Sequence, residues 1–200
     1  MTPPLQGLAL LDAGCGTGRR LPAVSSHGPH RVVGIDLVRE MLEVGRRLRG
    51  RDIRVSVADV RALPFPTRTF DVVWCRLVLG HTQRLDPAYQ EFFRVTKPGG
   101  SLTVTDFHAE AVAAGHVRTF RDVDGVVHAV ETQPHTAEDH RQAAASAGFL
   151  LTTARDCRVG PEVRNFWLQA GALERYEAQL GTPLLLALRF AKERRRGSQG

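Results

Sequence analysis

The sequence predicts an α/β fold: an open, doubly wound parallel sheet with helices on both faces. Three observations support this prediction. Short apolar runs alternate with helical patterns through the first half of the chain, as in repeated strand–helix units. A glycine-rich turn follows the first run, and an acidic residue closes or follows each of the first three runs. Such groups meet at one edge of a parallel sheet, where open α/β folds bind their ligands.

Seven apolar or β-branched runs are expected to form strands. They are Leu8–Ala13, Arg31–Asp36, Ile53–Val57, Phe70–Arg76, Ser101–Phe107, Phe149–Ala154 and Leu184–Phe190. The first run has no polar alternation, which favours a strand buried on both faces.

Five segments between and after these runs predict helices. They are Arg19–Ser26, Val38–Leu48, Pro87–Thr96, 136–147 and Val163–Leu180. Thr136, with Asp139 three residues later, is typical of a helix-opening cap. The turn Pro98-Gly99-Gly100 is expected to stop the chain before the next strand.

Residues 10–19 carry the clearest functional signal and read Leu-Leu-Asp-Ala-Gly-Cys-Gly-Thr-Gly-Arg. Alternate glycines at Gly14, Gly16 and Gly18 let the backbone turn tightly and approach a ligand without a Cβ in the way. A helix that starts near Arg19 would point its positive N-terminal end at that ligand. The alternative is a glycine-rich turn that serves geometry alone.

Acidic residues mark the ends of three predicted strands. Asp12 closes the first, Asp36 closes the second and Asp59 follows the third. A carboxylate after the second strand can accept both hydroxyls of a ribose, and one after the third can accept from an adenine amine. Asp12 could orient the loop amides or a ligand ammonium group. The alternative for each acid is a cap on the following helix, but three matching strand ends beside a glycine loop disfavour capping alone.

The run Leu-Asp-Ala-Gly-Cys-Gly-Thr-Gly resembles the first motif of the class I S-adenosylmethionine-dependent methyltransferases. Later segments resemble successive blocks of that family: Val-Ala-Asp-Val-Arg-Ala-Leu-Pro-Phe-Pro (57–66), Phe-Asp-Val-Val-Trp-Cys-Arg (70–76) and Phe-Phe-Arg-Val-Thr-Lys-Pro-Gly-Gly-Ser-Leu (92–102). The resemblance is closest to the branch that includes quinone-biosynthesis and natural-product methyltransferases. It implies a Rossmann-like sheet of seven strands with the last antiparallel, and S-adenosyl-L-methionine as the cofactor.

The resemblance also implies a cofactor pocket above the first, second and fourth strands. Its residues would be Asp12, Gly14, Cys15, Gly16, Gly18, Asp36, Leu37, Asp59 and Val60, with Cys75, Arg76 and Leu77 lining the methionine portion. Family members often carry a small polar cap where this chain has Val38, so Asp36 is expected to share the capping role. Only seven residues precede the first strand, where the family usually has one or two helices. The cofactor face is then open, covered by another chain, or completed by residues outside this sequence.

Methyl transfer needs an acceptor nucleophile in line with the S–CH₃ bond, and a general base assists hydroxyl or carbon acceptors. The catalytic candidates are His81 after the fourth strand, His108 after the fifth, and His135. The alternative for each is a surface or capping histidine. Asp106 is a candidate to orient a histidine or the substrate. Four aromatic residues could form an apolar substrate wall: Phe107, Phe120, Phe166 and Trp167.

One domain is expected over residues 1–200. Residues 8–107 would be its cofactor-binding half, 108–182 a substrate-side hairpin with helices, and 183–200 the final strand with a solvated basic tail. The hairpin is predicted from His116–Arg121 and Val126–Glu131, which flank Asp122-Val123-Asp124-Gly125.

Composition and charge narrow the classes of partner and function that the chain can have. The net charge of +6 comes from 27 basic and 21 acidic residues, and the arginines are scattered, which disfavours a nucleic-acid partner. Three cysteines without metal-ligand spacing predict a reduced, cytoplasmic protein with no metal site, and no apolar run is long enough to span a membrane. Methyl transfer to a small-molecule acceptor at O, N or C is the leading hypothesis. The alternatives are an RNA or protein methyltransferase and a non-catalytic cofactor-binding partner protein; a homodimer is compatible with the exposed N-terminal side.

Overall fold

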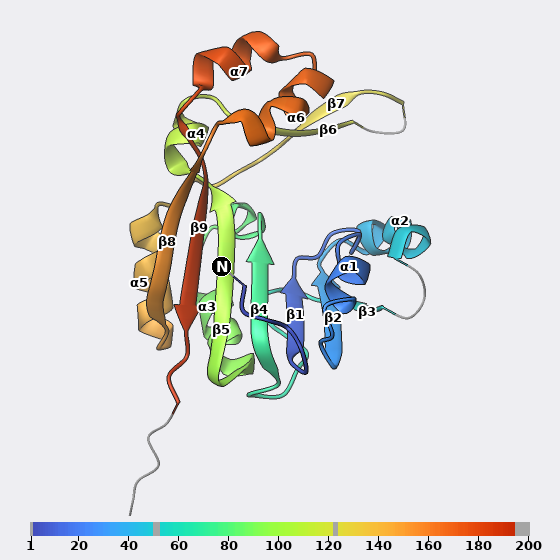
Figure 1. The fold of residues 1–200 in the computed structure, drawn as a ribbon, viewed down its shortest axis with the longest axis vertical. Coiled ribbons are helices and arrows are strands. Elements are labelled where there is room, and N and C mark those ends of the chain that lie inside the picture. Colours follow the sequence, from blue (N-terminus) through green and yellow to red (C-terminus); the bar gives the residue numbers. More distant parts are fainter. Residues whose placement is uncertain (1, 50–52, 122–123, 195–200) are drawn as a thin grey trace, which may run out of the picture.

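The computed structural model describes residues 2–49, 53–121 and 124–194. Its main sheet contains β1 (Ala9–Ala13), β2 (Arg31–Asp36), β3 (Arg54–Val57), β4 (Phe70–Arg76), β5 (Thr96–Phe107), β8 (Leu150–Arg158) and β9 (Pro183–Ala191). The strand order is β3-β2-β1-β4-β5-β9-β8 (Figure 1). Strands β1 to β5 run parallel, and β9 is antiparallel to both β5 and β8. The predicted α/β sheet of seven strands with an antiparallel last strand is confirmed.

The remaining elements are a hairpin, seven helices and two 3₁₀ turns within the described residues. The hairpin pairs β6 (Arg118–Arg121) with β7 (Val127–Val130), as expected, although Asp122 and Val123 of its turn lie outside the described residues. The helices are α1 (Leu21–Ser25), α2 (Arg39–Arg49), α3 (Asp86–Val95), α4 (Ala109–Ala113), α5 (Ala137–Ala147), α6 (Arg164–Gln169) and α7 (Leu173–Gln179). The 3₁₀ turns are η1 (Leu79–His81) and η2 (Pro161–Val163). None of the described helices combines the length and apolar character that a membrane crossing requires.

Helix α5 begins as the sequence predicts. The Thr136 hydroxyl accepts the Asp139 N–H at 3.1 Å, and the Asp139 carboxylate accepts the Thr136 N–H at 2.8 Å, which completes a reciprocal capping box. The helix ends at Gly148, whose φ of 103° is left-handed. Both signals are local in sequence, so they could be recognised without knowledge of the fold.

Two expectations about the bounds of elements are wrong, one for a helix and one for a strand. The single helix predicted over Val163–Leu180 is two helices, α6 and α7, because Gly171 adopts a left-handed φ of 66° between them. The turn predicted at Pro98-Gly99-Gly100 does not precede β5 but lies inside it. Thr96 already pairs with Phe70, and the register then shifts. Gly100 makes this irregularity possible, since a Cβ there would lie 2.7 Å from the Asp71 carbonyl oxygen.

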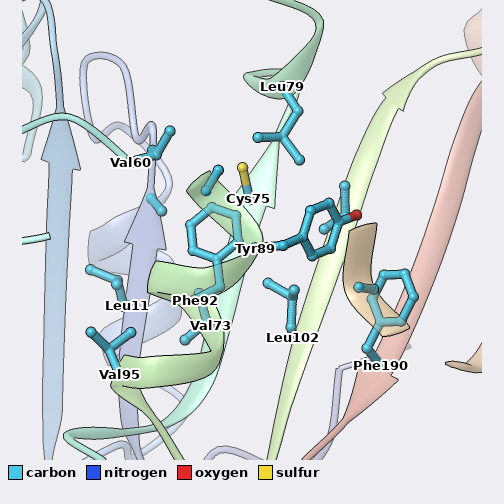
Figure 2. Close-up of a cluster of buried hydrophobic side chains, with 14 of the residues drawn as sticks. Leu11, Val60, Val73, Cys75, Leu79, Tyr89, Phe92, Val95, Leu102 and Phe190 are labelled. Atoms are coloured by element: carbon cyan, nitrogen blue, oxygen red, sulfur yellow. The ribbon is translucent and has the colours of Figure 1, made fainter. Parts of the chain in front are cut away.

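Buried side chains form separate clusters on the two faces of the sheet. The larger lies against α3 and α5 and includes Leu11, Val73 and Phe92 (Figure 2). On the opposite face, Leu10 packs with Val24 of α1 and with Leu5 of the N-terminal segment. Neighbouring residues of β1 therefore enter different clusters, as the alternation of side chains along a strand requires. Helices thus cover both faces, as predicted.

The carboxyl ends of β1, β2, β4 and β5 share one edge of the sheet. Beyond the ends of β4 and β5 lie α4, the β6–β7 hairpin, α6 and α7 (Figure 1). A third apolar cluster, formed by Ala111, Val159, Tyr176 and Leu184, packs these helices against the start of β9. The segment predicted to lie on the substrate side therefore borders this edge.

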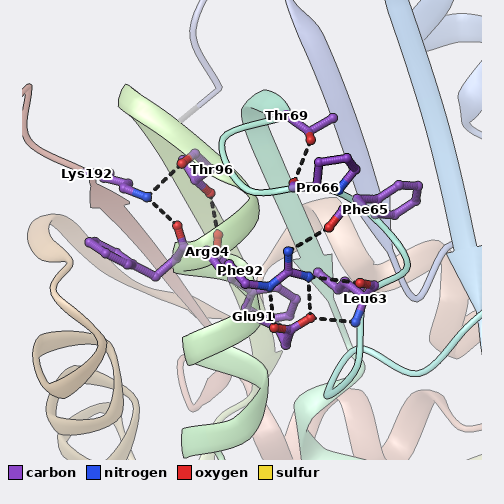
Figure 3. A network of polar contacts seen from close by, with 10 residues as sticks. Leu63, Phe65, Pro66, Thr69, Glu91, Phe92, Arg94, Thr96 and Lys192 are labelled. Atoms are coloured by element: carbon purple, nitrogen blue, oxygen red, sulfur yellow. Dashed lines mark hydrogen bonds and ion pairs between the residues drawn. The ribbon is translucent and has the colours of Figure 1, made fainter.

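The expectation of a solvated basic tail is wrong for Lys192. Its side chain is buried, and its ammonium group donates to the carbonyl oxygens of Phe93 at 2.5 Å and Thr96 at 2.8 Å (Figure 3). The same nitrogen lies 3.9 Å from the centre of the Phe93 ring. Lys192 thus ties the end of β9 to the junction of α3 and β5. Arg195 and Arg196 of the predicted tail lie outside the described residues.

Candidate functional site at the carboxyl edge of the sheet

The glycine loop after β1 is held tightly in place. Gly14, Gly16 and Gly18 have left-handed φ values of 80°, 59° and 69°. The N–H groups of Gly14 and Cys15 both donate to the Ile35 carbonyl oxygen at 2.8 Å. A Cβ on Gly14 would lie 2.1 Å from Val78 Cγ2, whereas one on Gly16 would meet only Met41 Cε at 3.5 Å. The chain therefore requires glycine at position 14 for space as well as for backbone conformation.

The Cys15 side chain lies close to β2. A Cβ added to Gly34 of β2 would lie 2.8 Å from the Cys15 sulfur, so the side chain packs close over that strand. The residue as a whole is half-buried.

Asp36 joins the end of β2 to the glycine loop. Its Oδ2 accepts the Gly16 N–H at 2.7 Å, and its Oδ1 accepts the Val38 N–H at 3.0 Å. Through the second contact Asp36 caps the start of α2, the role expected of it because residue 38 is not polar. Beside this carboxylate, Leu37 and Met41 are 62% and 40% exposed. An acidic group next to an exposed apolar surface is suited to a ligand with hydroxyl groups and a flat ring.

Asp59 forms an ion pair that the sequence analysis did not anticipate. The Arg61 guanidinium lies 2.6 Å from its Oδ2, and the Arg61 N–H donates to its Oδ1 at 2.8 Å. These hydrogen bonds lower the pKa of the Asp59 carboxyl. The neighbouring Val60 side chain is buried in the larger core cluster, so only its main chain can face a ligand.

Asp12 is buried at the end of β1 and pairs with Arg76 across the sheet. Asp12 lies opposite Trp74 in the β1–β4 register, and Arg76 Nη2 donates to Asp12 Oδ2 at 2.7 Å. Burial raises the pKa of the Asp12 carboxyl, and the Arg76 charge acts against that rise. The Arg76 guanidinium also stacks 4.5 Å from the centre of the Trp74 ring. Asp12 Oδ1 is buried without a hydrogen-bond partner among the described residues.

The end of β4 presents three consecutive residues in three different ways. The Cys75 side chain lies in the core beside Leu79 and Tyr89 (Figure 2), and burial raises the pKa of its thiol well above the usual value. Arg76 faces Asp12. Leu77 has a left-handed φ of 58°, unusual for a residue with a Cβ, and its N–H donates to the Thr105 carbonyl oxygen at 2.7 Å. Such backbone strain is concentrated at functional sites.

Asp106, at the end of β5, is committed to the backbone. Its Oδ2 accepts the Gly80 N–H at 2.6 Å, and its Oδ1 accepts the Phe107 N–H at 2.9 Å. Burial raises the pKa of its carboxyl, while the nearby His81 and His135 oppose that rise. Asp106 therefore fixes the η1 turn that carries His81, and within the described part of the chain it makes no hydrogen bond to a histidine.

The three candidate histidines border the same edge without touching one another. His108 caps α4, since its Nδ1 accepts the Glu110 N–H at 3.3 Å, and its Nε2 lies 3.6 Å from Asp156 Oδ1. His81 Nδ1 lies 3.1 Å from the Glu131 carbonyl oxygen. His135 Nε2 lies 2.8 Å from the Thr82 carbonyl oxygen. His108 thus acts as a helix cap, which was the alternative to a catalytic role. Catalysis by any of the three histidines stays a prediction.

The proposed aromatic wall is divided. Phe107 and Trp167 lie on either side of His116, with ring centres 4.7 Å and 6.0 Å from the His116 ring, and burial lowers the pKa of that histidine. Phe166, by contrast, is 71% exposed. The side chain of Phe120 lies outside the described residues.

A buried Tyr89–His140 pair behind this edge was missed by the sequence analysis. The Tyr89 hydroxyl lies 2.9 Å from His140 Nδ1, and both side chains are fully buried. Burial lowers the pKa of His140 to about 4. Among the described residues no cluster of three or more potential metal ligands is present.

The sheet order, the glycine loop and the acids at the strand ends define an α/β protein of the class whose members bind nucleotide-like cofactors at the carboxyl edge of the sheet. A family described as "Methyltransferase domain" matches residues 11–104. The malonyl-[acyl-carrier protein] O-methyltransferase of Enterobacter lignolyticus is 32% identical over 144 residues, 72% of this chain and 56% of that protein. The demethylmenaquinone methyltransferase of Clavibacter sepedonicus is 37% identical over 111 residues, 54% of this chain and 45% of that protein.

Solved structures show the same fold. An S-adenosylmethionine-dependent methyltransferase from Mesorhizobium loti superposes with a TM-score of 0.73 over 95% of this chain and 93% of that one, at 22% identity. The chain belongs to the class I S-adenosylmethionine-dependent methyltransferase family. It spans about half the length of the curated relatives that it matches.

Proposed function

We propose that this chain transfers a methyl group from S-adenosyl-L-methionine to a small-molecule acceptor, at O, N or C, by in-line displacement. The observation that carries the proposal is the coupling of Asp36 to the Gly14–Gly18 loop beside the buried carboxylate of Asp12. This arrangement places at one edge of the sheet an acid, a Cβ-free backbone and a carboxylate oxygen that has no hydrogen-bond partner among the described residues. The name of the demethylmenaquinone methyltransferase among the relatives supports a small-molecule acceptor, and the name of the malonyl-[acyl-carrier protein] O-methyltransferase supports methyl transfer.

The residues present fit the cofactor. Asp36 stands where a ribose would bind, and the exposed apolar surface of Leu37 and Met41 suits one face of an adenine ring. Asp12 Oδ1 has no partner among the described residues, and an ammonium group is a strong donor to such an oxygen. Asp59 can take an adenine amine only if it shares its carboxylate with Arg61.

When bound, the cofactor supplies a methyl group already activated by its positively charged sulfur. The protein then has to hold the acceptor in line and exclude water, and such positioning can contribute ~7–11 kcal/mol. Among the three candidate histidines we favour His81 for contact with the acceptor. Its Nδ1 is bound to a carbonyl oxygen, which leaves Nε2 turned towards the β6–β7 hairpin, whereas His108 caps a helix.

Acceptor-dependent formation of S-adenosylhomocysteine tests the proposal. The full chain is incubated with S-adenosylmethionine and a library of small hydroxyl, amine, carboxylate and carbon-acid compounds, and the methylated product is identified by mass spectrometry. His81→Gln should lower kcat while leaving S-adenosylhomocysteine affinity unchanged. Cofactor binding with no turnover of any compound would favour the non-catalytic alternative.

His27→Gln is the matched control for this experiment. His27 is also exposed, and its Nδ1 also lies beside a backbone carbonyl oxygen, that of Ala23 at 2.7 Å. It follows α1, whereas His81 belongs to η1 after β4. The variant should therefore keep the kcat of the wild type, and an equal fall in both variants would remove the specific role proposed for His81.

We also propose a cytoplasmic location and a small-molecule acceptor in place of a nucleic acid. The scattered arginines support the latter, because binding to a phosphate backbone would depend steeply on salt. Turnover that falls many-fold between low and physiological salt would contradict it. A homodimer stays a proposal too, and analytical ultracentrifugation in solution decides it.

A further inference from the structure

The β6–β7 hairpin is anchored directly over the end of β4. Arg118 Nη1 donates to the Leu77 carbonyl oxygen at 3.3 Å, and His81 Nδ1 lies 3.1 Å from the Glu131 carbonyl oxygen. The Gln133 N–H donates to the Gly80 carbonyl oxygen at 2.7 Å. These three contacts join the hairpin and the residues after it to segment 77–81. The position of Arg118 is therefore set by both ends of the hairpin.

Arg118 has no acidic partner among the residues that the structure describes. It contacts the Leu77 carbonyl oxygen and His81 Nε2, the latter 3.5 Å from Nη1. Within the described part of the chain, no carboxylate lies within ion-pair distance of its guanidinium. Other arginines of the chain do pair with carboxylates: Arg61, Arg76, Arg94 and Arg141. Most of the donor capacity of Arg118 is thus unused.

His81 also makes this place favourable for an anion. A carbonyl oxygen beside Nδ1 requires a proton on that nitrogen, so the Nε2 of a neutral His81 accepts from Arg118. Neither group supplies a negative charge. Asp106, the acid that holds this turn, has both oxygens bound to backbone N–H groups. An anion that enters here would meet a guanidinium fork that pairs with no carboxylate among the described residues.

We infer that Arg118, with His81, recognises a carboxylate group of the methyl acceptor. The planar guanidinium matches a carboxylate in a bidentate arrangement, which is more selective than attraction between point charges. The inference rests on the proposed function, because it places the acceptor beside Leu77 at the end of β4, next to the residues expected to line the methionine portion. It adds the chemical class of the acceptor and names the residue that selects it.

Titration of the full chain with succinate, and with succinamide as the uncharged match, tests the inference. The signals of the histidine rings are followed by NMR, with and without S-adenosylhomocysteine. Succinate should shift the His81 ring signals, assigned through His81→Gln, and succinamide should not. Arg118→Gln should weaken the succinate response about tenfold or more, as expected when a charge-assisted pair is lost. Arg118→Lys keeps the charge but loses the fork, and should lose the preference for succinate over inorganic phosphate.

Arg158→Gln is the matched control, because Arg158 is also exposed and also donates Nη1 to a backbone carbonyl oxygen, that of Gly181 at 2.8 Å. It should leave the succinate response unchanged. Equal responses to succinate and succinamide, or an equal loss in both arginine variants, would overturn the inference. Because the titration without S-adenosylhomocysteine reads the anion site alone, a failure of cofactor binding is seen separately as a failure of the proposed function.

Discussion

Lowering the pH should destabilise the fold through His140. This histidine is fully buried against Tyr89, and its pKa is lowered to about 4 from an ordinary 6.5. Burial is the main cause, the charge of His135 adds to it, and Asp139 opposes it. Between these two pKa values the unfolded chain binds a proton that the folded chain rejects. Stability from this group is therefore complete above pH 6.5 and is lost as the pH falls towards 4.

The size of the effect follows from the difference of about 2.5 pKa units. At 1.36 kcal/mol per unit, the free energy of unfolding should fall by about 3 kcal/mol between pH 7 and pH 4 through this residue. That is a large part of the 5–15 kcal/mol that is typical of a whole domain. Urea denaturation followed by tryptophan fluorescence, at several pH values between 7 and 4, measures the loss.

The control removes both partners together, as Tyr89→Phe with His140→Leu, because removing only one would leave a buried polar group unsatisfied. Carboxyl groups with shifted pKa values, such as Asp12 and Asp106, are present in both proteins and cancel in the comparison. The double variant should lose about 3 kcal/mol less than the wild type over this range. Equal losses in the two proteins would refute the reasoning.

Three further predictions concern single residues. Gly14→Ala should lower the free energy of unfolding by more than about 2 kcal/mol, because the new Cβ would overlap Val78. Gly16→Ala has space for its Cβ and should cost only about 1 kcal/mol for its left-handed backbone conformation. Thermal unfolding compares the two variants, and equal shifts in melting temperature would contradict the predicted difference. Lys192→Met keeps the apolar stem but loses both hydrogen bonds to carbonyl oxygens, so the free energy of unfolding should fall by about 2 kcal/mol. An unchanged midpoint of urea denaturation would show that these buried hydrogen bonds contribute nothing to stability. Arg61→Ala frees the Asp59 carboxylate, so calorimetry should find that the variant binds S-adenosylhomocysteine as tightly as the wild type or a few-fold more tightly. Much weaker binding by the variant would show that Arg61 itself contributes to cofactor binding.

The parts of the fold that local sequence determines could be predicted. The bounds of β2 and β4 agree with the apolar runs Arg31–Asp36 and Phe70–Arg76, because these runs are dominated by side chains that favour strands and end at polar groups. The capping box of α5 and the glycine loop were recognised for the same reason. The break at Gly171 was missed because the apolar pattern continues across it.

Contacts that depend on tertiary structure could not be predicted. The Asp12–Arg76 pair joins residues 64 positions apart and needs the β1–β4 register. The burial of Lys192 depends on how β9 meets the start of β5, 96 positions away. The three histidines illustrate a different limit, since a position after a strand fits both a catalytic group and a cap. Only the folded structure shows that His108 caps α4.

Calorimetric titration with S-adenosylhomocysteine tests the central claim most directly, namely that the Gly14–Gly18 loop and Asp36 form a cofactor site. The wild type should bind with micromolar affinity. Asp36→Ala should weaken binding at least about tenfold, as the loss of a charge-assisted bidentate contact implies, and Asp156→Ala, an exposed acid on β8, should leave it unchanged. No binding by the wild type, or equal binding by Asp36→Ala, would contradict the account.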